Sequence, residues 1–253
     1  MMVKHKSYRL KNGKQLYIFP LSDLHLGSPN CNIDYFHYWA EIFEKTPKNK
    51  IIYCLGDLID FQSLKVGAFD TTMTADNQII ELIELLKPYK KYINYMTIGN
   101  HAKRPRKDYN LDVGHIIADS LEVPYNRSEF FDTLRINGKE FVVYGKHGTK
   151  FSSRIELAEG GMVRDTSNIR ADLLMQGHNH YCKGFSRPIT TKDGIKRKYY
   201  GFTGHFLSYR NSYANERNMP HNPEGFLRYN INGNCIVGWN EYHIDERKNE
   251  LLK

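Results

Sequence analysis

The sequence predicts an α/β fold, because apolar runs of strand length alternate with segments of helical periodicity. The runs are too short for helices and are rich in aliphatic and aromatic residues, which is typical of buried strands. Strands that alternate with helices in this way usually form a largely parallel sheet with helices on its faces. The five central runs occupy residues 16–21, 51–55, 93–98, 141–145 and 172–176.

Helical periodicity marks three segments between these runs. The clearest is 79–86, which follows the capping candidates Thr74 and Asp76 and ends before Pro88. The other two are 35–43 and 111–121.

After Gly184 the pattern changes to short apolar runs separated by Gly, Asn and Asp. Such turns predict antiparallel strands, at 198–202, 225–231 and 235–242. We expect a single domain over 1–253, in which residues 184–253 supply C-terminal strands that complete a second sheet.

The composition narrows the range of partners and compartments. The formal net charge of +8 favours polyanions such as nucleic acid or nucleotides, although it also suits simple solubility. The four cysteines are scattered without a Cys-x-x-Cys pair, which favours a reducing, cytoplasmic setting. The N-terminal residues contain no apolar stretch of signal-peptide length, and no run approaches membrane-spanning length. We therefore expect no membrane partner.

Polar side chains follow each of the five central runs at once. In open α/β sheets, ligands bind outside the carboxyl ends of the strands. We therefore expect these side chains to gather at one edge of the fold. They are Asp23 and His25, Asp57 and Asp60, Asn100 and His101, His147, and finally His178 and His180.

This set offers oxygen and imidazole donors without a thiolate. Such donors suit Mn²⁺, Fe, Zn²⁺ or Mg²⁺. Their number exceeds what one tetrahedral ion needs, and it fits two ions that share a bridging carboxylate. Paired ions can hold both the attacking and the leaving oxygen of a phosphoryl displacement, and a bridging water would become a hydroxide nucleophile near neutral pH.

The order of the motifs resembles that of the calcineurin-like metallophosphoesterases, in particular their compact stand-alone bacterial and bacteriophage members. Asp-x-His, Gly-Asp-x-x-Asp, Gly-Asn-His, a lone His and Gly-His-x-His follow one another between residues 23 and 180. One such motif is weak evidence, whereas five in order are specific. The resemblance implies a four-layer αββα sandwich, with two packed mixed sheets flanked by helices.

The resemblance also implies a role for each site residue. Asp57 would bridge two divalent metal ions, with Mn²⁺ favoured. His101 would protonate the leaving oxygen or stabilise its charge, and Asp60 would orient His101, although Asp60 could also simply cap the next segment. His205 matches no motif and is read as structural. The first ion would be held by Asp23, His25, Asp57 and His180, and the second by Asp57, Asn100, His147 and His178.

Two departures from the family pattern bear on the substrate. Ala102 stands where an acidic residue is common, and Phe61 stands where protein Ser/Thr phosphatases have Arg-Gly. A basic run follows Ala102, and cations at the mouth of a phosphoryl site could contact neighbouring phosphates. The candidate substrate-binding residues are Lys103, Arg104, Arg106 and Lys107.

A second basic cluster, at residues 192–198, precedes Tyr199 and Tyr200 and could form a hairpin with rings available for stacking on bases. The alternative interpretation is that this cluster is only a solvent-exposed basic surface.

Three functions remain open. The favoured one is a phosphodiesterase or nuclease that acts on nucleic acid or nucleotides. The second is a phosphomonoesterase for a small metabolite or a terminal phosphate, since the same metal centre could serve it. The third is a non-enzymatic scaffold, which the complete set of ligand candidates disfavours.

Overall fold

The computed structural model describes residues 6–11, 13–61, 71–149, 152–192, 194–208 and 222–243. Its helices are α1 (Ile33–Lys45), α2 (Ala75–Leu86), the 3-10 helix η1 (Lys87–Tyr92), α3 (Arg104–Tyr109), α4 (Val113–Ser120) and α5 (Ile155–Asp165). Its strands are β1 (Ser7–Tyr8), β2 (Leu16–Leu21), β3 (Lys50–Leu55), β4 (Ile93–Thr97), β5 (Glu129–Ile136), β6 (Lys139–Lys146), β7 (Leu173–Gln176), β8 (Cys182–Thr191), β9 (Gly194–His205), β10 (Gly225–Ile231) and β11 (Val237–His243).

The strands form two packed halves of one mixed sheet. Hydrogen bonds join eleven strands in the order β1-β5-β6-β7-β9-β10-β2-β3-β4, with β8 beside β9 and β11 beside β10. The halves meet through a short antiparallel pairing, in which Gly225 faces His205 and Phe226 faces Gly204. The strands of the C-terminal segment are therefore shared between the halves: β9 pairs with β7 and β8, and β10 pairs with β2 and β11. The part of that segment at 209–221 and 244–253 lies outside the described residues.

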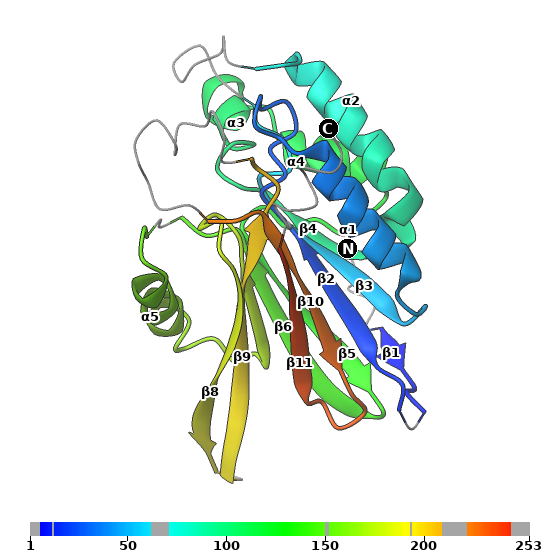
Figure 1. Ribbon diagram of the computed structural model, residues 1–253, viewed down its shortest axis with the longest axis vertical. Coiled ribbons are helices and arrows are strands. Elements are labelled where there is room, and N and C mark those ends of the chain that lie inside the picture. The colour runs from blue at the N-terminus through cyan, green and yellow to red at the C-terminus, as the bar shows by residue number, and fades with distance from the viewer. Residues whose placement is uncertain are drawn as a thin grey trace.

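Apolar side chains explain the layers seen in Figure 1. Between the halves, residues of β5 and β6 such as Leu134 and Phe141 pack with Ile18 and Leu55 of β2 and β3. Helices α1, α2 and α4 cover the outer face of β2, β3 and β4, where Trp39 is fully buried. Helix α5 covers β7 and β9 on the other side. The expected αββα arrangement is confirmed.

All five central runs are strands, and the three segments with helical periodicity are α1, α2 and α4. Thr74 is the N-cap residue of α2 as predicted, although its side chain makes no capping hydrogen bond. In α1 the Asn32 side chain accepts a hydrogen bond from the Tyr35 N–H. Such a bond satisfies one of the free donors in a helix's first turn. Within the described residues, no helix is both long and apolar enough to cross a membrane.

A buried polar network ties β3 and β4 to β5. The Tyr53 hydroxyl donates to Asp132 Oδ2 at 2.6 Å, and Asn94 Nδ2 donates to the same oxygen at 2.9 Å. Tyr53 is fully buried and Asp132 is 3% exposed. Each donor therefore stabilises a buried carboxylate that water does not reach.

The Tyr53→Phe variant is expected to be less stable by about 1–3 kcal/mol, because a buried carboxylate loses one of its donors. Urea unfolding followed by circular dichroism measures the change. Tyr89→Phe is the matched control, since the Tyr89 hydroxyl reaches an exposed Glu44 oxygen at 3.3 Å. Equal stability of the two variants would contradict the role given to the network.

Candidate metal centre

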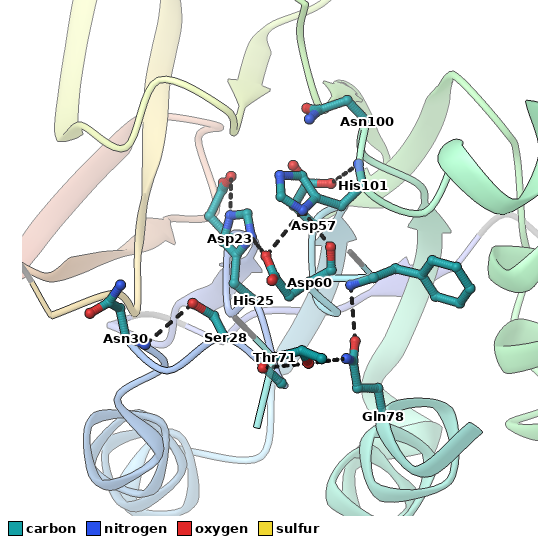
Figure 2. A network of polar contacts seen from close by, with 12 residues as sticks. Asp23, His25, Ser28, Asn30, Asp57, Asp60, Thr71, Gln78, Asn100 and His101 are labelled. Carbon is teal, nitrogen blue, oxygen red and sulfur yellow. Dashed lines mark hydrogen bonds and ion pairs between the residues drawn. The ribbon is translucent and has the colours of Figure 1, made fainter. Parts of the chain in front are cut away.

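The predicted site residues gather at one end of the sheet. Strands β2, β3 and β4 run parallel, as do β6 and β7, so their carboxyl ends share an edge. Figure 2 shows the side chains of Asp23, His25, Asp57, Asp60 and His101 directed toward one another at this edge.

Five of the candidate ligands have left-handed backbone conformations, which non-glycine residues seldom adopt. Such strain is concentrated at functional sites, where the surrounding structure holds it in place. The φ angles are 54° for Asp23, 49° for His25, 48° for Asp57, 69° for His178 and 57° for His180.

The glycines of two motifs permit a close approach to the carboxylates. A Cβ at Gly99 would lie 2.0 Å from Asp57 Oδ1, and one at Gly177 would lie 2.6 Å from Asp23 Oδ2. Only glycine therefore lets the Gly-Asn-His and Gly-His-x-His segments pass this close to the two aspartates.

A backbone N–H one or two residues after each of these glycines then fixes a carboxylate. The His101 N–H donates to Asp57 Oδ1 at 2.9 Å, and the His178 N–H donates to Asp23 Oδ2 at 3.0 Å. Hydrogen bonds between a backbone amide and a carboxylate thus join the second motif to the third and the first motif to the fifth.

The first group of candidate ligands consists of Asp23, His25 and His180. Asp23 Oδ1 lies 3.3 Å from His180 Nε2 and 3.8 Å from His25 Nε2. His25 Nδ1 lies 3.3 Å from Asp60 Oδ1 and donates to it, since a carboxylate oxygen accepts. His25 Nε2 is buried without a hydrogen-bond partner. A metal ion would bind both this imidazole nitrogen and the carboxylate beside it.

The second group consists of Asp57, His147 and His178, with Asn100 beside them. His147 Nδ1 donates to the Leu55 carbonyl at 2.8 Å. His147 Nε2 lies 2.9 Å from Asp57 Oδ2 and 3.1 Å from Asn100 Oδ1. A ring that binds a metal is neutral, and in that form this nitrogen would present a lone pair to two oxygens that also have lone pairs. A cation among the three atoms would satisfy all of them.

The electrostatics of the site favour positive charge. Burial alone would raise the pKa of the Asp57 carboxyl, but the charge and the hydrogen bond of His147 outweigh burial and lower this pKa to about 2. Burial alone would lower the pKa of His25, but its contacts with Asp23 and Asp60 outweigh burial and raise this pKa to about 10. Buried carboxylates that hold cationic partners so strongly suit a divalent ion.

Asp60 connects the first group to His101. Asp60 Oδ1 lies 3.1 Å from His101 Nδ1 as well as 3.3 Å from His25 Nδ1. The two rings meet edge to face with centroids 4.6 Å apart. Asp60 therefore contacts both a candidate ligand and the candidate proton donor, a double contact that its motif alone did not indicate.

The basic run after Ala102 forms the short helix α3, which the sequence pattern did not predict. The Arg104 guanidinium reaches His101, with Nη2 3.3 Å from Nε2. Arg106 and Lys103 are half-buried, and Lys107 is exposed. Of the four candidate substrate-binding residues, Arg104 is thus the one that the structure places in contact with the site.

The second basic cluster does not fit the stacking hypothesis. It lies on the β8–β9 hairpin as expected, but Tyr199 and Tyr200 are buried, and Lys198 Nζ donates to the Thr166 and Ile169 carbonyls. The strand β9 has 12 residues, and at about 3.3 Å per residue the hairpin tip lies about 35 Å from the strand's site end. The proposed rings are therefore core residues, and the exposed cations are remote from the metal centre.

His205 contacts the candidate centre, which the sequence argument missed. Its ring stacks on that of His180, with centroids 5.0 Å apart and planes at 27°. Its Nε2 faces the Asn222 carbonyl at 3.1 Å, and its Nδ1 accepts from the Leu207 N–H at 3.2 Å. Its position at the end of β9 was the available signal, because the other site histidines also follow strands.

The His205→Ala variant is expected to bind metal about ten- to a hundredfold more weakly, because the His180 ring loses the surface that holds it in place. Titration calorimetry with Mn²⁺ measures the affinity. His205→Phe keeps a flat ring and should recover most of the loss. An alanine variant with wild-type affinity would show that the stacking is incidental.

The comparison with protein families agrees with this geometry. A model of the calcineurin-like phosphoesterase family matches residues 18–182, which include every candidate ligand. The chain belongs to the calcineurin-like phosphoesterase family. Membership supports a metal-dependent phosphoester hydrolase, and the ligand clusters suggest that it binds divalent metal.

Several solved structures resemble the chain at low identity. Vacuolar protein sorting 29 of Cryptosporidium parvum is 14% identical, with 91% of this chain and 99% of that one covered and a TM-score of 0.44. A predicted phosphoesterase of Streptococcus pneumoniae TIGR4 is 12% identical, with 91% and 99% covered and a TM-score of 0.42. A Vps29 single mutant of Entamoeba histolytica is 12% identical, with 91% and 100% covered and a TM-score of 0.47. No curated protein matches the sequence significantly.

Proposed function

We propose that the chain is a dinuclear metal-dependent phosphodiesterase or nuclease that acts on nucleic acid or nucleotides. The observation that carries the proposal is the pair of ligand groups beside His101, with the basic helix α3 starting three residues further on. The ligand groups support phosphoester hydrolysis, and the cations of α3 favour a substrate with several phosphates.

The two groups support an assignment of the metal ligands. In this assignment Asp57 would be the bridging carboxylate, and Mn²⁺ would be the favoured ion. Two such ions would supply Lewis-acid activation of the phosphoryl group and of water. Asp23, His25, Asp57 and His180 would hold one ion, and Asp57, Asn100, His147 and His178 would hold the other.

His101 acts on the leaving oxygen. Its Nδ1 is engaged by Asp60, so Nε2, which Arg104 Nη2 contacts at 3.3 Å, is the nitrogen that would face the substrate. A proton at Nε2 would neutralise the charge that develops as the ester bond breaks. Asp60 fixes the ring's orientation and tautomer through the hydrogen bond at Nδ1.

A reducing, cytoplasmic location is part of the proposal. All four cysteines are free thiols. Burial raises the pKa of Cys54 to about 12, so its thiol stays protonated and unreactive. Such thiols are typical of proteins from reducing compartments.

A paired assay in Mn²⁺ tests the proposal. The substrates are p-nitrophenyl phosphate, bis(p-nitrophenyl) phosphate, and labelled single- and double-stranded DNA and RNA, with Asp57→Ala as the inactive control. Wild-type protein is expected to shorten a nucleic acid and to hydrolyse the bis ester. Turnover of the monoester alone would replace the proposal with a phosphomonoesterase. Metal-loaded protein that hydrolyses none of these substrates would contradict the proposed function.

A further inference from the structure

The guanidinium of Arg104 occupies the open side of the His101 ring. Arg104 Nη2 lies 3.3 Å from His101 Nε2. Arg104 Nη1 lies 3.4 Å from the Asp60 carbonyl oxygen and 3.3 Å from that of Phe61. One amino group thus holds the segment after β3, while the other faces the histidine.

The partners of His101 determine which nitrogen carries the hydrogen. Nδ1 faces the carboxylate and the carbonyl oxygen of Asp60, and both of these groups accept. A guanidinium has only donors. The hydrogen therefore lies on Nδ1, and Nε2 accepts a hydrogen bond from Arg104.

This hydrogen bond can be exchanged for a stronger one. It is long, and its acceptor is a ring nitrogen and not an anion. A phosphate oxygen is anionic, so its hydrogen bond to a guanidinium is shorter and stronger. The links from Nη1 to the two carbonyls can keep the guanidinium beside the site while Nη2 turns from the ring to an anion.

We propose that Arg104 is a specificity-determining residue. On substrate binding its guanidinium moves away from His101 Nε2 and binds the phosphate that neighbours the scissile phosphate on the leaving-group side. This inference rests on the proposed function of the site. It narrows the substrate class to phosphodiesters that have a second phosphate, as a nucleotide chain does. The two metal ions would hold the scissile phosphate itself. The guanidinium of Arg104 would then bind the neighbouring phosphate.

The remaining cations of α3 agree with this direction. Arg106 and Lys107 follow Arg104 on the same helix, half-buried and exposed respectively. Positive charge therefore continues from the His101 side of the metal centre along α3. A chain that leaves the site on this side would keep its phosphates near cations.

Binding of two small nucleotides tests the inference without any turnover. The probes are adenosine 5′-monophosphate and adenosine 3′,5′-bisphosphate, titrated calorimetrically into Mn²⁺-loaded wild type, Arg104→Ala and Arg104→Lys. Wild type is expected to bind the bisphosphate about ten- to a hundredfold more tightly, as a charged hydrogen bond implies. Arg104→Ala should lose most of this preference, and Arg104→Lys should keep part of it. Arg135→Ala is the matched control, because Arg135 lies on β5 in an exposed pair with Glu140.

Each outcome decides the inference. Equal weakening of both nucleotides in Arg104→Ala would mean that Arg104 binds the scissile phosphate or only supports the loop, and would overturn the proposal. A wild type without preference would overturn it too. Circular dichroism and metal content show whether the variants are folded and loaded. If the preference follows Arg104 but no nucleic acid is cleaved, the proposed function fails while the inference stands.

Discussion

The Asp57→Ala variant is expected to lose both metal ions and more than about a thousandfold of the hydrolytic rate, because the proposed bridging carboxylate would serve both ions, and the ions would supply several kcal/mol of transition-state stabilisation. Asp57 is 2% exposed, and its Oδ2 lies 2.9 Å from His147 Nε2. Elemental analysis of protein purified in Mn²⁺ gives the metal content, and bis(p-nitrophenyl) phosphate gives the rate.

Folding of the variant must be checked, since Asp57 Oδ1 also accepts the His101 N–H. Circular dichroism serves for this. Asp34→Ala is the matched control, because Asp34 is an exposed aspartate in the first turn of α1. It should keep two metals and full activity. An Asp57→Ala protein that retains two metals per chain would show that Asp57 does not bridge them.

The His101→Ala variant is expected to lower turnover by about a hundred- to ten-thousandfold while metal content stays normal, because general acid catalysis is worth roughly that factor. The His101 ring forms a third close group with His25 and Asp60 but lies outside the two groups assigned to the metal ions, and its backbone N–H to Asp57 survives the substitution. Turnover is measured under saturating substrate, and metal content is measured on the same preparation.

His37→Ala controls for the loss of a histidine, since His37 is exposed on α1. Asp60→Asn should share part of the His101 defect, because Asp60 Oδ1 is 3.1 Å from His101 Nδ1. A His101→Ala enzyme as fast as wild type would remove His101 from the chemistry. Loss of metal together with activity would make its role structural instead.

Local sequence patterns were enough for most of the fold. Apolar periodicity located the central strands and three helices, because each segment buries one face or both. Helix α5 escaped prediction, since Gly160 and Gly161 interrupt it, and glycine is a poor helix former. Only Ala158 and Met162 of α5 are buried, so its apolar face is too narrow to be recognised from the periodicity of the sequence.

The site could be predicted where each residue follows its own strand. Five strand ends carry their candidate ligands within a few residues, so order and spacing were enough to predict that these side chains lie close together. His205 and Arg104 could not be found in this way, because their contacts depend on distant parts of the chain. His205 reaches His180 where β9 crosses to pair with β10. Arg104 turns toward carbonyls of Asp60 and Phe61, whose position no motif near Arg104 specifies.

Anomalous diffraction from crystals grown with Mn²⁺ tests the central claim most directly. We predict two peaks roughly 3.5–4 Å apart, with the Asp57 carboxylate between them. One peak should lie beside Asp23, His25 and His180, and the other beside His147 and His178. A single peak, or two peaks that do not share Asp57, would contradict the dinuclear centre on which the proposed function depends.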